Sequence, residues 1–156
     1  MYKSWHDYGY GVNVGNLETD ADRLRGLLEL APLAKDEVVD AIENLELTSY
    51  ESLTIDDFEI IGSELSYTNA ELNPVVCIVT QAISEIADVH LSLVTDFDDN
   101  HYIIVPFTHP WDLTETMKNW KSDNDIKTLF KKYFDIITDQ PFDKFDYDYQ
   151  AVENGG

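Results

Sequence analysis

The chain has 156 residues, of which 44% are hydrophobic and 12% are aromatic. This length suits a single domain with a substantial core, and the aromatic content excludes a disordered acidic tail. The 31 Asp and Glu residues against ten Lys and Arg residues give a formal net charge of −21. A field of this sign repels nucleic acid and anionic membrane and attracts basic surfaces. A net charge of about 2–8 in magnitude is enough to keep a small domain soluble, so the excess leaves two interpretations open: a charge that serves the function, and solubility alone.

The chain has one cysteine, Cys77, which excludes an internal disulfide and a CxxC metal site. The N-terminal residues include no apolar signal region, and no apolar run approaches the length of a membrane span. We therefore expect a cytoplasmic protein that has no membrane partner.

The first elements are predicted from alternation and capping signals. Residues 8–14 alternate and are rich in aromatic and β-branched side chains, which predicts a strand. The glycines of this segment are spaced GxGxxxG, which fits close packing within a strand better than a phosphate-binding loop. Thr19 and Asp22 resemble a capping box that opens a helix, and Pro32 is expected to end it.

A second helix is predicted at about residues 36–46, with Val38, Ile42 and Leu45 on its buried side. Helical spacing gathers four carboxylates on the other side of this helix. We call them the acidic ridge: Asp36, Glu37, Asp40 and Glu43.

Two further helices and a hairpin follow. Thr54 and Asp57 form a capping signal for a third helix, and Asn73 with Pro74 opens a fourth that is apolar nearly all round. Alternation at residues 89–93, Asp and Asn residues at 98–100 and an apolar run at 102–107 predict a hairpin.

The C-terminal part predicts a helix and a strand. Ser122 with Asp125 opens the last helix, which carries several of the five clustered lysines of residues 118–132. Residues 145–149 alternate strictly, which is typical of a strand with one aromatic and one carboxylate face. The carboxylate face would present a second acidic row, Asp143, Asp146 and Asp148.

These elements predict one α+β domain over residues 1–156. An antiparallel sheet of about four strands, from both chain ends and the central hairpin, would be covered mainly on one face by about five helices.

The search for catalytic chemistry gives one candidate. Asp96, Asp98, His101 and His109 flank the hairpin and would serve a small metal-dependent enzyme if they converged on a metal. Asp and Asn are also the residues that hairpin turns favour, and we expect this simpler role. We therefore predict no catalytic residue, no metal and no cofactor.

Three segments resemble a family of small acidic proteins of phages and mobile elements of Gram-positive bacteria. They are residues 8–11 (YGYG), residues 96–111 from DFDDNHY to PW, and the tail VENGG. The resemblance names no catalytic residue. It implies an accessory phage protein, and anti-CRISPR inhibitors that mimic DNA are the nearest functional analogy.

The expected function is an acidic inhibitor that binds a basic nucleic-acid-handling protein, such as a CRISPR effector nuclease, without binding nucleic acid itself. Two alternatives stay open at this point: an acidic accessory protein without mimicry, and the metal-dependent enzyme. Trp111 would be an aromatic anchor in such an interface, or else a cap on the core. The candidate partner-binding carboxylates are the acidic ridge, the second acidic row, and Asp56, Asp57 and Glu59.

Overall fold

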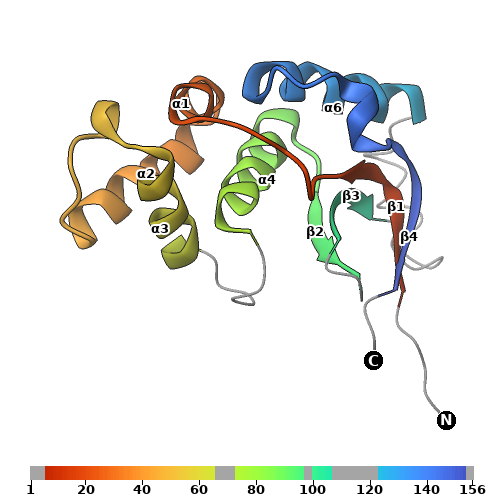
Figure 1. Ribbon diagram of the computed structural model, residues 1–156, viewed down its shortest axis with the longest axis horizontal. Helices are drawn as coiled ribbons and strands as arrows, with labels where there is room; N and C mark the ends of the chain where they lie inside the picture. Colours follow the sequence, from red (N-terminus) through yellow and green to blue (C-terminus); the bar gives the residue numbers. More distant parts are fainter. Residues whose placement is uncertain (1–5, 66–72, 97–99, 107–122, 154–156) are drawn as a thin grey trace, which may run out of the picture. The chain divides into compact units, whose positions relative to one another are not determined.

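The computed structural model describes residues 6–65, 73–96, 100–106 and 123–153, which contain five α-helices and four strands (Figure 1). The chain divides into two compact units. We call residues 1–17, 89–135 and 140–156 the sheet unit, and residues 18–88 and 136–139 the helical unit. The predicted α+β class and the four-stranded antiparallel sheet are confirmed. The expectation of one cooperative domain stays a prediction.

The sheet takes its strands from both chain ends and a central hairpin, as predicted. They are β1 (His6–Asn13), β2 (Ser92–Thr95), β3 (His101–Pro106) and β4 (Asp148–Glu153), in the order β2-β3-β1-β4. Every pairing is antiparallel. The first hairpin strand is shorter than predicted, because Val89 and Leu91 are buried ahead of β2 rather than paired within it.

Gly11 shows why β1 contains glycine. It lies opposite Ile104 in the register of β1 and β3. A Cβ atom at this position would lie 2.0 Å from the carbonyl oxygen of Ile103, far inside van der Waals contact. The glycine therefore permits a close approach of two backbones, in agreement with the strand interpretation of this segment.

The core of the sheet unit includes a cluster of aromatic rings from α6 (Asp123–Ile137) and the short 3-10 helix η3 (Phe142–Phe145). The ring centroids of Phe134 and Phe145 are 4.9 Å apart in an edge-to-face arrangement, and Phe134 meets Phe142 at 6.1 Å. Phe134 and Phe145 are both almost completely buried. Edge-to-face geometry is favoured because a positive ring edge meets a negative ring face.

The predicted last strand was placed too early. Residues 142–145 form η3, Asp146 adopts the left-handed conformation with φ of 47°, and β4 begins only at Asp148. The aromatic residues explain the shift, because Phe142 and Phe145 lie one 3-10 turn apart and both contact Phe134. A strand here would have pointed these two rings to opposite faces.

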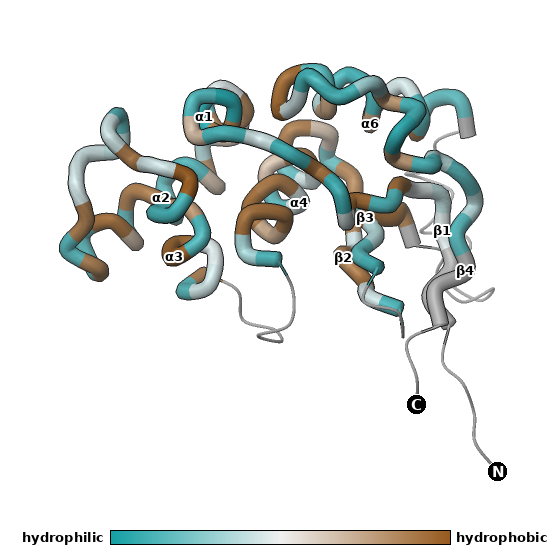
Figure 2. The backbone as a smooth tube through the Cα atoms, in the orientation of Figure 1, coloured by the Kyte–Doolittle hydropathy of each residue, from teal (hydrophilic) through white to brown (hydrophobic). Residues whose placement is uncertain are grey.

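The described helices of the helical unit are α1 (Ala21–Leu28), α2 (Pro32–Asn44), η1 (Tyr50–Ser52), α3 (Ile55–Leu65) and α4 (Pro74–Ala87). Figure 2 shows that α4 is apolar along most of its length. As predicted, this helix is largely buried and is capped by Asn73, whose side chain accepts hydrogen bonds from the backbone N–H groups of Val75 and Val76. Gly62 allows α3 to approach α4, because a Cβ there would lie 2.3 Å from the carbonyl oxygen of Pro74.

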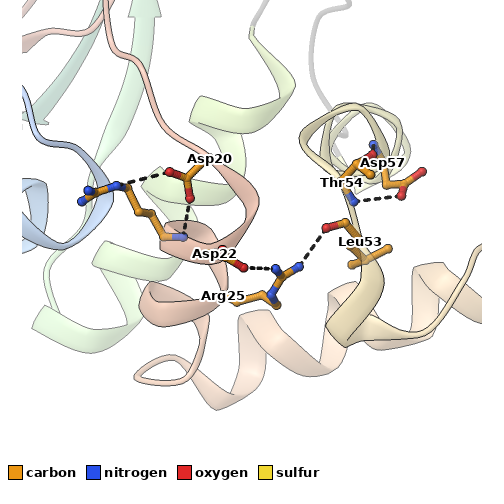
Figure 3. Close-up of polar contacts among 7 residues, drawn as sticks. Asp20, Asp22, Arg25, Leu53, Thr54 and Asp57 are labelled. Atoms are coloured by element: carbon orange, nitrogen blue, oxygen red, sulfur yellow. Dashed lines mark hydrogen bonds and ion pairs between the residues drawn. The ribbon is translucent and has the colours of Figure 1, made fainter.

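The helix starts were only partly predicted. The capping box of α3 is confirmed, since the Thr54 N–H donates to Asp57 and the Asp57 N–H donates to Thr54 Oγ1 (Figure 3). The prediction for α1 was wrong by one residue, because its N-cap is Asp20, whose carboxylate accepts from the Arg23 N–H.

The prediction for α2 was wrong at its start. This helix begins at Pro32, the residue expected to end the preceding one. Its N-cap residue makes no side-chain hydrogen bond. Instead, the carboxylate of Glu85 on α4 accepts from the N–H groups of Leu33 (3.0 Å) and Ala34 (2.8 Å). A carboxylate at a helix N-terminus satisfies free donors and complements the helix dipole.

Within the described residues, no helix combines the length and the apolar character that a membrane crossing requires.

Candidate protein-binding surface

The acidic ridge lies on the exposed side of α2. Helical spacing places Ala34, Val38 and Ala41 on the buried side, and each is at most 7% exposed. All four ridge carboxylates, Asp36, Glu37, Asp40 and Glu43, are exposed. The prediction that these residues share one solvent-facing side of a helix is therefore confirmed, although the helix starts four residues earlier than expected.

The carboxylates of α3 divide into two kinds. Asp56 and Glu59 are exposed on the side opposite the buried Phe58 and Ile61. Asp57 is only half-exposed, and its carboxylate accepts from the Thr54 N–H at 3.0 Å. Asp57 therefore acts first as a helix cap, and Asp56 and Glu59 are the carboxylates of α3 that face solvent.

The three basic side chains of the helical unit are paired with acids other than the ridge. Arg23 contacts Asp20 and Asp139. Arg25 pairs with Asp22 and donates to the carbonyl oxygen of Leu53 at 2.8 Å (Figure 3). In the part of the chain that the structure describes, no ion pair reaches a ridge carboxylate.

Lys35 is the basic residue nearest to the ridge in sequence, and it is held elsewhere. Its ammonium lies 2.9 Å from Glu29 Oε1 and 5.0 Å from the ring centroid of Tyr50. Burial, together with the nearby negative charge of Glu29, raises the pKa of Tyr50 to about 12. Lys35, the one cation of α2, thus contacts Glu29 and Tyr50 and forms no ion pair with the ridge.

The charge of the chain is concentrated in the helical unit. This unit contains 18 Asp and Glu residues against three Lys and Arg residues, whereas the sheet unit contains 13 against seven. The exposed residues of α6 include Lys127, Lys131 and Lys132, which partly offset the acids of the sheet unit. Three of the five clustered lysines of residues 118–132 thus lie on the exposed side of α6, while residues 107–122 lie outside the described part.

The second acidic row does not form one face of a strand. Asp143 belongs to η3, Asp146 is the left-handed residue after it, and Asp148 begins β4. All three are exposed, but consecutive changes of backbone conformation separate them. The expectation of a regular row was therefore wrong, because it depended on a strand that starts later than predicted.

The described hairpin residues form local hydrogen bonds that stabilise the turn. The two carboxylate oxygens of Asp96 accept from the Asn100 N–H at 2.9 Å and from the Asn100 side-chain amide at 3.0 Å. His101 Nδ1 lies 3.3 Å from Thr95 Oγ1. Asp98 and His109 lie outside the described residues, as does Trp111. Among described residues, no group of three His, Cys, Asp or Glu side chains is arranged to hold a metal ion.

Exposed aliphatic side chains within the acidic surface were missed by the sequence analysis. Leu33 is 69% exposed, Leu30 is 50% exposed, Ile60 is 49% exposed and Val39 is 37% exposed. Leu33 and Val39 belong to α2, and Ile60 belongs to α3. If the sequence prediction had started this helix at Pro32, helical spacing would have placed Leu33 on the same side of the helix as the acidic ridge.

A scan against protein-family models, a search of curated proteins and a search of solved structures each find no match to this chain. The resemblance to small acidic phage proteins therefore stays a prediction.

Proposed function

We propose that this chain is an acidic inhibitor that binds the nucleic-acid channel of a basic host enzyme. By analogy with anti-CRISPR proteins, the target is a nucleic-acid-handling defence enzyme such as a CRISPR effector nuclease. The observation that carries the proposal is the acidic ridge, four exposed carboxylates to which no cation of the described chain is paired. Unpaired surface charge of one sign is free to attract a surface of the opposite sign.

The spacing of the ridge supports mimicry of a phosphate backbone. Residues 36 to 43 span about 10 Å of helix axis, because each residue of an α-helix rises about 1.5 Å. Four carboxylates over this length give about one charge per 3 Å. Phosphates along one DNA strand recur at about 3.4 Å of helix axis, so a channel that neutralises phosphates would meet a similar charge density.

The proposal predicts a partner that can be displaced by nucleic acid. The tagged protein is used to capture partners from a lysate of the host bacterium, and each partner is then purified. Binding of the purified partner is measured with increasing duplex DNA, single-stranded DNA or RNA. We expect competition by at least one nucleic acid and affinity that falls as salt rises, because exposed charges are screened within about 8 Å at physiological ionic strength.

The controls separate mimicry from ordinary acidic binding. A neutral polymer of similar length should not displace the partner. A partner that stays bound at saturating nucleic acid would contradict mimicry and favour an acidic accessory protein that uses the same surface.

A further inference from the structure

Leu33 is an exposed apolar side chain at the N-terminal end of the acidic ridge. It belongs to the first turn of α2, and it lies one turn from Asp36 and Glu37 and two turns from Asp40. At 69% exposure it is the most exposed of the large hydrophobic side chains in the described residues. Phosphate mimicry requires only charge on this surface and gives an exposed leucine no role.

Two other exposed aliphatic side chains, one on α2 and one on α3, also lie among carboxylates. Val39 lies on α2 one turn from both Asp36 and Glu43, and Ile60 lies on the exposed side of α3 with Asp56 and Glu59. Single exposed aliphatic residues are common on protein surfaces. Here they recur on two exposed helix faces whose polar neighbours are mostly carboxylates.

We propose that the exposed face of α2 docks against an amphipathic, basic α-helix of the partner, with Leu33 as the apolar anchor. This inference rests on the proposed function and specifies the chemistry of the partner. In it, Leu33 inserts between aliphatic side chains of the partner helix, while Asp36, Asp40 and Glu43 pair with its lysines or arginines.

Charge and length identify this occupant. The exposed face of α2 from Leu33 to Glu43 is about three helical turns long, and its charged side chains are all carboxylates. A helix that carries cations and apolar residues at spacings of three and four presents both groups along the same length. A second copy of the chain is disfavoured as the occupant by its own charge of −21.

Burial of Leu33 predicts binding that salt only partly removes. Fully burying a leucine side chain is worth about ten-fold to hundred-fold in affinity, and this apolar term is not screened by salt. Charge pairing alone would instead disappear steadily as salt is raised.

The test uses two synthetic peptides of identical composition, built from leucine and lysine. One arranges leucine at helical spacing, and the other has the same residues in scrambled order. Each is titrated into the isotope-labelled full chain at 0.15 M and 0.5 M NaCl, with affinity from calorimetry and the binding surface from amide shifts. We expect the helical peptide to bind more tightly, to shift amides of residues 33–43, and to retain binding at 0.5 M NaCl.

Two single substitutions locate the apolar contact. Leu33→Ser, which suits the first turn of a helix, is expected to weaken binding of the helical peptide at least ten-fold. Tyr149→Ser removes a side chain that is 45% exposed on the sheet unit and is expected to change affinity less than two-fold. The amide spectrum of each free variant verifies that the fold is retained.

The outcomes separate this inference from the proposed function. If both peptides bind equally and Leu33→Ser has no effect, the surface is purely electrostatic and the inference is overturned, while displacement of a natural partner by nucleic acid still supports the inhibitor. Amide shifts confined to residues outside α2 would also overturn it. Concentration-dependent self-association that Leu33→Ser abolishes would instead assign this face to a second copy.

Discussion

The helical unit and the sheet unit differ in the residues of their cores and in their charge. The described buried residues of the helical unit are mostly aliphatic, and this unit contains 18 acidic residues against three basic ones. The sheet unit buries an aromatic cluster, and its acidic and basic residues number 13 and seven. Different residues therefore supply the aromatic packing and the concentrated negative charge. A substitution in the aromatic cluster leaves the charged residues unchanged, and a substitution of an acidic residue leaves the aromatic cluster unchanged.

The two units also differ in how their acids are used. In the helical unit, the cations are held by Asp20, Asp22 and Glu29, and the ridge carboxylates stay unpaired in the described structure. In the sheet unit, described acids such as Asp96 and Asp148 accept backbone hydrogen bonds close to them in sequence. Acids of the first kind are available to a partner, whereas those of the second kind stabilise local structure.

The largest effect is expected from the aromatic cluster of the sheet unit. Phe145→Ala should lower the free energy of unfolding by about 3–5 kcal/mol, because it removes a buried ring that packs against Phe134. Urea unfolding followed by circular dichroism measures this loss. Tyr149→Ala, which truncates a half-exposed ring, is the control and should cost less than about 1 kcal/mol.

The same variant tests whether the two units form one domain. Amide hydrogen exchange should show equal loss of protection in α4 and in β1 if the chain unfolds as one cooperative unit. Loss confined to β1 would contradict the single domain.

A smaller effect is expected at the start of α2 in the helical unit. Glu85→Ala should lower the free energy of unfolding by about 1 kcal/mol, because Leu33 and Ala34 lose the acceptor for their N–H groups. Glu85→Gln should lose less, since its amide oxygen still accepts one hydrogen bond. Thermal unfolding measures both variants, and equal stability of Glu85→Ala and the unmodified chain would show that this cap is not stabilising.

A further effect appears only at alkaline pH. The pKa of Tyr50 is raised from its ordinary 10.0 to about 12 in the folded chain, so between pH 10 and 12 the unfolded chain releases a proton that the folded chain keeps. Stability should therefore fall as pH rises through this window, and Tyr50→Phe should reduce the fall. Tyrosinate absorbance should also lose its late-titrating component in the variant. Identical titrations would contradict the raised pKa.

Local signals in the sequence predicted much of the fold. The capping box at Thr54 and Asp57 and the cap at Asn73 located α3 and α4 correctly, because both signals act within three residues. Alternation predicted β1 and the hairpin strands, although β2 proved shorter. The start of α2 was missed because Glu85, which satisfies its first N–H groups, is more than 50 residues away.

The candidate surface was predicted in its charge but not in its apolar part. Helical spacing alone places Asp36, Asp40 and Glu43 on one side of a helix, and that side is exposed in the structure. Leu33 was missed because the predicted helix began after it. The second acidic row was misplaced because the contacts of Phe142 and Phe145 with Phe134 override the alternation of residues 145–149.

The central claim is that partner binding uses the acidic ridge of the helical unit, and two matched charge reversals test it most directly. Asp36, Asp40 and Glu43 are changed to Lys in one variant, and Asp143, Asp146 and Asp148 in the other, so both variants gain six charge units from the starting −21. The association rate with the captured partner is measured at low and physiological salt, with thermal unfolding as a control for folding. We expect the ridge reversal to slow association at least ten-fold and the other reversal to slow it far less. Equal slowing by both variants, or slowing by the second alone, would contradict the claim.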